Sequence, residues 1–268
     1  MKHFKLKVFI LIGILIASLG SIWAMVYFPE NYIYLSSADI QTAERVLKRN
    51  GVTIEKDAIP KLVKPMPSAS ATGKFNSSSE VADVIFKGGY EKNGNVCYKD
   101  NIKVRLNPEI LIKANPPVLS EKFNNVTSKN AVKKITRITD DYNFNISDSV
   151  IETYDGQGKY LIVIVTQKHS EYLVFNNSLR FTISDKGISS ITGLWFETEN
   201  VRNEKHKPKS PVDVLIDFSL DENNEGEHIV SFTQGYRLDT DSQKSEKVEL
   251  IPTWRILTGS GEIFYSDF

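Results

Sequence analysis

Hydrophobic and polar residues follow two different periods along this chain, and an unbroken apolar run precedes both. Residues 8–28 form that run and carry no charge. Beyond it, stretches with helical spacing are followed by stretches in which apolar and polar residues alternate, the pattern of half-buried strands. This order occurs more than once. The pattern predicts an α+β fold, with an N-terminal transmembrane helix followed by two helix-plus-antiparallel-sheet units in residues 30–118 and 119–268.

The best-marked helix begins soon after the apolar run. Ser36 is a good N-cap residue, and Asp39, three positions later, completes a capping box. An apolar face follows, and a glycine ends the helix. Two further helices are predicted. One covers about 128–142, and the other has Ser210 as its cap and Pro211 as its first residue.

Most of the remaining chain is predicted to form strands. Residues 61–80 are rich in proline, serine and alanine and show little periodicity, so a loop is expected there. The polar residues 200–209 are expected to form a second loop. Predicted strands cover residues 81–86, 96–106, 110–113, 149–154, 160–167, 171–175, 179–184 and 188–199, and two long strands run through "HIVSFTQGYRL" and "VELIPTWRIL".

Residues 8–28 are predicted to be an uncleaved membrane anchor. As a helix they would be about 31 Å long at roughly 1.5 Å per residue, close to the thickness of a bilayer core. Lys2, Lys5 and Lys7 precede the run, so residues 1–7 are expected to stay in the cytoplasm and the remainder to lie outside. A cleaved signal peptide is the alternative, but its apolar region would be only about 7–15 residues long.

Small residues follow one face of this predicted anchor. Their spacing places them on a single ribbon along the helix: Gly13, Ala17, Gly20, Ser21 and Ala24. Small residues let two helices approach closely, and in lipid this packing drives helix association. We therefore expect this face to bind a helix of another membrane protein, or of a second copy of the chain in a homodimer. Chance placement of common small residues is the alternative.

Composition and charge exclude several functions. The chain has 33 basic and 33 acidic residues and a formal net charge of +0, so a nucleic-acid footprint is not expected. Cys97 is the only cysteine, and the four histidines lack the spacing of metal ligands. Motifs for a serine nucleophile, a phosphate-binding loop or a zinc protease are absent from the sequence. The sequence predicts a non-enzymatic protein without a cofactor or a bound metal.

The C-terminal part of the chain carries the most specific motifs. Gly235 and Tyr236 lie in one strand, and Pro252, Trp254 and Arg255 lie in the next, "LIPTWRIL". Together with the anchor and with "SSADIQTAERVLKRNGVTIEKDAIP" just outside it, these motifs resemble the YycI family. The resemblance implies a single-span accessory protein of the WalK/WalR cell-wall two-component system, related to YycH and built from repeated helix-plus-sheet units.

The resemblance also implies a function and partners. It implies regulation of a WalK-type sensor histidine kinase through contacts of membrane helices and extracytoplasmic domains, with a YycH-like protein as a further partner. The residues leave open an extracytoplasmic module that binds a wall fragment or a peptide, and an enzyme such as a hydrolase ranks third. For Trp254 they favour core packing over binding, with Pro252 marking a sheet edge or a strand start.

Overall fold

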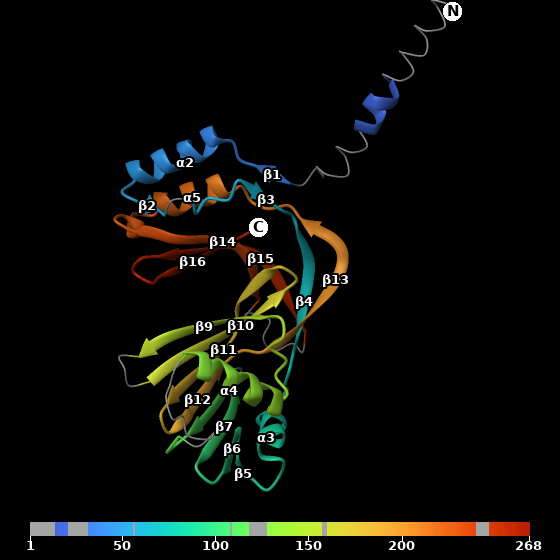
Figure 1. The fold of residues 1–268 in the computed structure, drawn as a ribbon, viewed down its shortest axis with the longest axis vertical. Helices are drawn as coiled ribbons and strands as arrows, with labels where there is room; N and C mark the ends of the chain where they lie inside the picture. Colours follow the sequence, from blue (N-terminus) through green and yellow to red (C-terminus); the bar gives the residue numbers. More distant parts are fainter. Residues whose placement is uncertain are drawn as a thin grey trace, which may run out of the picture.

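The structure of the protein is a computed structural model. It describes residues 14–20, 32–55, 57–107, 109–117, 128–156, 160–239 and 247–268. Figure 1 shows two lobes joined by long strands. The terminal lobe is built from the described residues between 32 and 63 together with those after residue 206. The middle lobe is built from the described residues between 75 and 195.

The helices and strands alternate irregularly along the chain. Beyond the short helix at residues 14–20, the described helices are α2 (Ser37–Arg49), α3 (Ser78–Phe86), α4 (Ser128–Asp141) and α5 (Pro211–Leu220), with a 3-10 turn at Glu222–Asn224. The first strands are β1 (Ile33–Tyr34), β2 (Thr53–Ile54), β3 (Leu62–Val63), β4 (Met66–Gly73), β5 (Glu91–Asn93), β6 (Val96–Lys99), β7 (Ile102–Asn107) and β8 (Glu109–Ala114). The later strands are β9 (Ser149–Gly156), β10 (Tyr160–His169), β11 (Tyr172–Ser184), β12 (Gly187–Gly193), β13 (Phe196–His206), β14 (His228–Leu238), β15 (Lys247–Thr258) and β16 (Ile263–Asp267).

Most of these strands belong to one mixed sheet. In the part of the chain that the structure describes, this sheet is 14-stranded, and its main path is β13-β4-β15-β14-β11-β12-β8-β7-β6-β5. Most pairings are antiparallel, but β11 and β2 each pair with β14 in parallel. The predicted α+β class is confirmed. The sheet is mixed, whereas the sequence had indicated purely antiparallel units.

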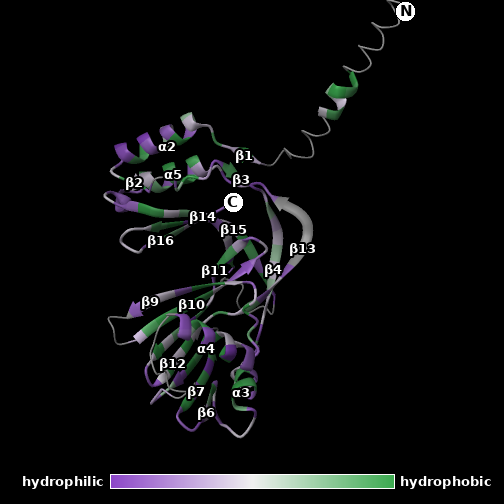
Figure 2. Ribbon diagram, viewed as in Figure 1, coloured by the Kyte–Doolittle hydropathy of each residue, from purple (hydrophilic) through white to green (hydrophobic). Residues whose placement is uncertain are grey.

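The middle lobe buries one face of its strands under two helices. A single row of paired residues crosses six strands on that face: Val163, Phe181, Ile191, Ile112, Val104 and Cys97. All six are fully buried, and residues of α3 and α4 complete their cluster. Figure 2 shows hydrophobic and hydrophilic residues alternating along these strands. Alternation along a strand places every second residue on the covered face.

The terminal lobe has its own core, assembled from both ends of the described chain. Residues of α2 and α5 pack with residues of β14 and β15, and the buried Trp254 belongs to this cluster. Helix α2 begins as the sequence predicts. Ser36 accepts a hydrogen bond from the Asp39 amide, and the Asp39 carboxylate accepts one from the Ser36 amide. For α5, Ser210 is the N-cap residue and Pro211 is at the first turn, as predicted, but the side chain of Ser210 makes no capping hydrogen bond.

Two assignments in the first half of the chain were also wrong. The segment 61–80, expected to be a loop, contains β3, β4 and the start of α3. Strand β4 lies between β13 and β15, and its small residues, such as Ala69 and Ala71, are buried there. Residues 81–86, expected to be a strand, belong to α3. The buried Val81, Ala82 and Phe86 lie on one helical face, and a short apolar run does not distinguish that face from a strand.

Other boundaries moved because strands continue past polar residues. Strand β13 extends to His206 by pairing with β4, so the loop expected at 200–209 begins later. The strands expected at 171–175 and 179–184 are one strand, β11, whereas the stretch 188–199 divides into β12 and β13. The division into units at 30–118 and 119–268 stays a prediction. Strand pairings cross it, because β4 pairs with β13 and β15.

The predicted anchor, residues 8–28, lies largely outside the described residues. Only residues 14–20 of it are described, and they are helical. Within the described ranges, no helix has both the length and the apolar character needed to span a membrane.

Two adjacent asparagines of β11 connect the lobes. Asn177 is fully buried; its amide donates to the Phe196 carbonyl, and its oxygen accepts from the Phe196 amide, each at 2.9 Å. Asn176 binds Leu238 of β14 in the same two-bond manner, at 3.2 and 2.7 Å. Each asparagine side chain thus makes the pair of hydrogen bonds that a neighbouring strand would make. The backbone N–H and C=O groups of Phe196 and Leu238 therefore have partners where regular strand pairing stops.

Replacing Asn177 with alanine should destabilise the protein by roughly 2–5 kcal/mol. The change leaves the Phe196 N–H and C=O buried without partners, and each such group costs about 1–3 kcal/mol. Urea unfolding followed by circular dichroism measures the effect. Asn93→Ala, at an exposed position of β5, is the control and should change stability by less than about 0.5 kcal/mol. Equal midpoints for the two variants would contradict the prediction.

Candidate functional site

The five C-terminal motif residues meet at the junction between the two lobes. They lie on β14 and β15, which pair so that Tyr236 faces Pro252 and Gln234 faces Trp254. On its other side β14 meets β11 of the middle lobe, through the pairs Leu173–Gly235 and Val174–Tyr236. We call this region the junction site. The structure therefore brings together residues that the sequence only placed on neighbouring strands.

Tyr236 of β14 contacts residues of β4, β10 and β11. Its side chain is fully buried, and its hydroxyl donates a 2.7 Å hydrogen bond to the Pro67 carbonyl of β4. Its ring makes edge contacts with His169 and Tyr172, with centroids 5.6 and 6.0 Å away. Burial raises the pKa of the Tyr236 hydroxyl well above its ordinary value, and the neighbouring Tyr172 adds to the rise. The hydroxyl is therefore a neutral donor at physiological pH.

Gly235 allows β11 and β14 to approach closely. A Cβ atom at this position would lie 2.4 Å from Cζ of Phe175 and 2.7 Å from the Leu173 carbonyl oxygen. Both distances are shorter than non-bonded atoms tolerate, so only glycine fits. The Phe175 ring occupies this space and supports Arg255, whose guanidinium carbon lies 4.5 Å from the ring centroid. Gly235, Phe175 and Arg255 form one stack across the two lobes.

Pro252 lies inside β15, at a change of strand partners. On one side of β15, strand β4 pairs up to Leu250 and β16 pairs from Thr253 onward. A proline cannot donate to a strand ladder, and it stands here where one partner strand gives way to the next. The sequence had indicated an edge or a strand start. The physical reason is the one expected, because proline has no N–H to donate. Pro252 nevertheless lies in the middle of β15 rather than at its start.

Trp254 is a core residue of the terminal lobe. Its side chain is 1% exposed, and it stacks on Phe232 with ring centroids 4.5 Å apart. The indole N–H donates a 3.0 Å hydrogen bond to the Lys209 carbonyl, which fixes the start of α5. The predicted packing role is therefore what the structure shows.

A hollow of about 630 Å³ lies elsewhere in the terminal lobe, between α2 and the segment after β2. Ile40 and Ile59 line it together with the carboxylates Glu44, Glu55 and Asp57. Glu55 contacts His228 at 3.2 Å. In the described ranges, no group of histidine, cysteine and acidic side chains is arranged to hold a metal ion. The lining of the hollow thus combines apolar side chains with carboxylates and with Lys61, and it includes no residue of the junction site.

The small-residue face of the predicted anchor is only partly described. Ala17 and Gly20 lie in the helix over residues 14–20 and are exposed, whereas Gly13, Ser21 and Ala24 lie outside the described residues. Its binding role stays a prediction. Sequence reasoning also missed Phe175, Asn176 and Asn177, which complete the junction site. An Asn-Asn pair inside an apolar strand was the one signal that pointed to them.

The family model described as "YycI protein" matches residues 30–264. The solved structure of YycH from Bacillus subtilis has a TM-score of 0.52 at 10% identity, covering 80% of this chain and 55% of that one. An uncharacterized protein from Eubacterium rectale has a TM-score of 0.49 at 12% identity, covering 85% and 96%. No curated protein matches the chain.

The protein is a two-lobed α+β scaffold, and its motif residues pack at the junction between the lobes. The chain belongs to the YycI family, because the family model matches most of its length. It shares its fold with YycH, although it spans only about half of that protein's length. Membership of this family points to an accessory protein of the WalK pathway.

Replacing Trp254 with alanine should destabilise the protein by roughly 3–5 kcal/mol, the usual range for removing a buried large aromatic side chain. Thermal and urea unfolding measure the change. Tyr160→Ala serves as the control, because Tyr160 is 42% exposed and should contribute little. An unchanged unfolding midpoint for Trp254→Ala would show that the side chain does not support the core.

Replacing Tyr236 with phenylalanine should change the response to alkaline pH. The buried hydroxyl has a raised pKa, so it stays protonated in the folded state when the unfolded chain ionises above about pH 10. Stability is therefore full below that pH and falls as pH rises further. Urea unfolding at pH 8 and pH 10.5 should show a smaller loss for Tyr236→Phe. An equal loss in both proteins would refute the assignment.

Proposed function

We propose that this protein is a membrane-anchored accessory regulator of a WalK-type sensor histidine kinase. Membership of the YycI family is the observation that carries the proposal. The fold shared with YycH supports it. Residues 1–7 would lie in the cytoplasm, residues 8–28 would span the membrane, and both lobes would face the cell wall. A YycH-like protein would be a second partner.

Regulation would act through contacts and would need no chemical step. A regulator changes kinase output only if it binds one kinase state more tightly than the other. The small-residue ribbon offers such a contact inside the membrane, because small residues let a partner helix approach. The lobes would supply further contacts outside. The junction site would hold the lobes in a fixed relation, so that both kinds of contact act on the same partner.

Replacing Gly13 and Ala17 together with leucine should change kinase output several-fold. Leucine keeps the segment apolar, so membrane insertion should persist, but its bulk separates the helices. A coupling of about 1–3 kcal/mol corresponds to a several-fold change or more. The measurement is transcription of the kinase's target genes, in cells that contain normal amounts of the variant protein.

Ser18→Leu is the matched control. Ser18 lies outside the ribbon, roughly 120° around the helix from the centre of the ribbon, and its hydroxyl bonds the Leu15 carbonyl within the helix. The leucine adds bulk beside the ribbon rather than on it, so output should stay at the wild-type level. Wild-type output in the double leucine variant, at normal protein level, would show that the segment is only a tether.

A further inference from the structure

The middle lobe leaves one face of its sheet uncovered by the described chain. Both α3 and α4 pack on the opposite face, the one that contains the buried row from Val163 to Cys97. Strand register identifies the residues of the uncovered face without ambiguity. One row contains Thr182, Ser190, Lys113, Lys103 and Tyr98, and the next contains Arg180, Thr192, Leu111 and Arg105.

Four cations stand in these two rows: Lys103 and Arg105 on β7, Lys113 on β8 and Arg180 on β11. We call them the basic strip. None of the four forms an ion pair or a side-chain hydrogen bond with another described residue. The Lys103 ammonium group makes a cation–π contact with Tyr98, 5.9 Å from the ring centroid. The acidic residues of the same rows, Glu91 and Glu152, stand at the outer ends.

Lys103 and Lys113 are direct cross-strand partners. Side chains in that relation have Cβ atoms about 4.5–5.5 Å apart, and like charges there destabilise the sheet. Arg105 follows two residues along β7 on the same face, and its Nε atom is buried without a hydrogen-bond partner in the described chain. An anion lying on the strip would relieve the repulsion between the lysines, and arginine would bind its oxygens in a bidentate manner.

The shape of the strip selects the kind of anion. Neighbouring strands are about 4.8 Å apart, so Arg105 and Arg180, three strands apart, are separated by roughly 14 Å. The strip is only two rows wide, about 7 Å. A folded partner needs about 800 Å² per side for a stable interface, which is several times the area of the strip. A linear chain of repeated charges fits a long, narrow surface better.

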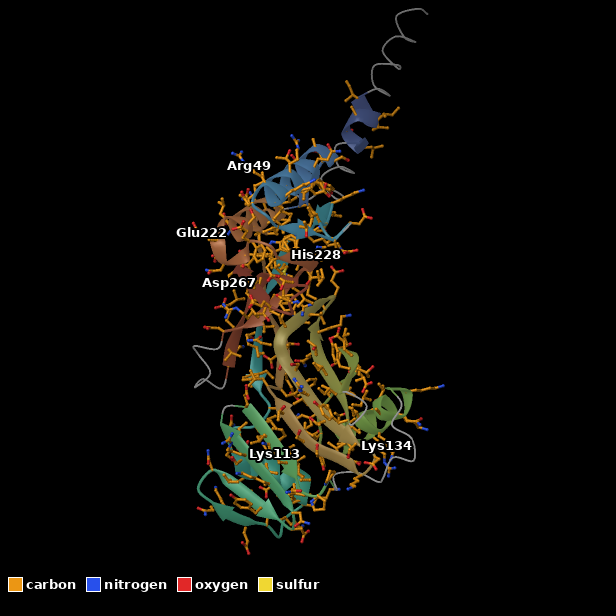
Figure 3. The ribbon with its side chains drawn as sticks, turned by 90° about the vertical axis from the view of Figure 1, so that its left-hand side faces the viewer. Arg49, Lys113, Lys134, Glu222, His228 and Asp267 are labelled. Atoms are coloured by element: carbon orange, nitrogen blue, oxygen red, sulfur yellow. The ribbon has the colours of Figure 1, made fainter. Side chains whose placement is uncertain are left out.

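We propose that the basic strip binds a linear polyanion with repeating phosphate groups. The inference rests on the proposed function, in which this lobe faces the cell wall, where such a polymer would have to be present. Figure 3 shows Lys113 on the strands and Lys134 on α4, at the other side of the lobe. Helix α4 therefore offers a matched control surface that is also basic.

The test uses the full-length protein in neutral detergent micelles, with inorganic polyphosphate as the probe and calorimetry as the measurement. The double variant Lys113→Gln/Arg180→Gln should bind at least tenfold more weakly than the wild type. Its affinity should also depend less steeply on salt, because fewer counterions are released. The control Lys129→Gln/Lys133→Gln removes the same charge from exposed positions of α4 and should bind within twofold of the wild type.

Folding and ligand class are tested in the same preparations. Lys113→Gln alone should not lower the melting temperature, because it removes repulsion from Lys103, so weaker binding cannot be attributed to unfolding. Polyglutamate of equal charge should bind at least tenfold more weakly than polyphosphate. Absence of wild-type binding, an equal loss in the α4 control, or equal affinity for polyglutamate, which would indicate an acidic protein surface, would each overturn the proposal.

This result is separable from the proposed regulation. The Gly13→Leu/Ala17→Leu variant keeps the whole basic strip, so its binding of polyphosphate should equal that of the wild type. Failed binding with an anchor-dependent kinase output would reject only the strip. Intact binding with an unaffected output would reject only the role of the anchor.

Discussion

A close approach of two strands at Gly235 holds the two lobes of this protein together. Strand β11 pairs with β14 in parallel at only two positions, Leu173–Gly235 and Val174–Tyr236. Any side chain at 235 would overlap the Phe175 ring, and the same ring supports Arg255. Such a short pairing would leave backbone groups exposed on either side. The side-chain amides of Asn176 and Asn177 form hydrogen bonds with such backbone groups, at Leu238 and Phe196. These bonds attach β11 to β14 and to β13.

Segments that are far apart in the sequence build the core of the terminal lobe. Helix α2 comes early in the sequence, but its core partners Phe232 and Trp254 come near the end. The lobe can complete its core only when β14 and β15 are present. Strand β15 pairs with β14 along one side and with both β4 and β16 along the other. Strands β14 and β15 thus join the two lobes and complete the core of the terminal lobe.

This architecture separates the surfaces on which function can depend. Packing residues occupy the junction site, where Tyr236 and Trp254 are buried and inaccessible to a partner. The sheet face of the middle lobe that the described chain leaves uncovered, by contrast, carries cations that form no ion pair with another described residue. The terminal lobe follows the N-terminal segment directly and offers a hollow rimmed by carboxylates. The fold therefore keeps its packing residues apart from the surfaces that a partner could reach.

Local rules in the sequence determined the elements whose signals are local. The capping box at Ser36 and Asp39 specified the start of α2, alternation specified β10, β14 and β15, and the motif residues led to the YycI family. Tertiary structure alone decided the rest. Strand β4 has no periodic signal, because small side chains suit a strand packed between two others, and the helical face of α3 is defined only by what it contacts. The junction site and the basic strip depend on register between distant strands. Register is set by long-range packing, which no window of the sequence contains.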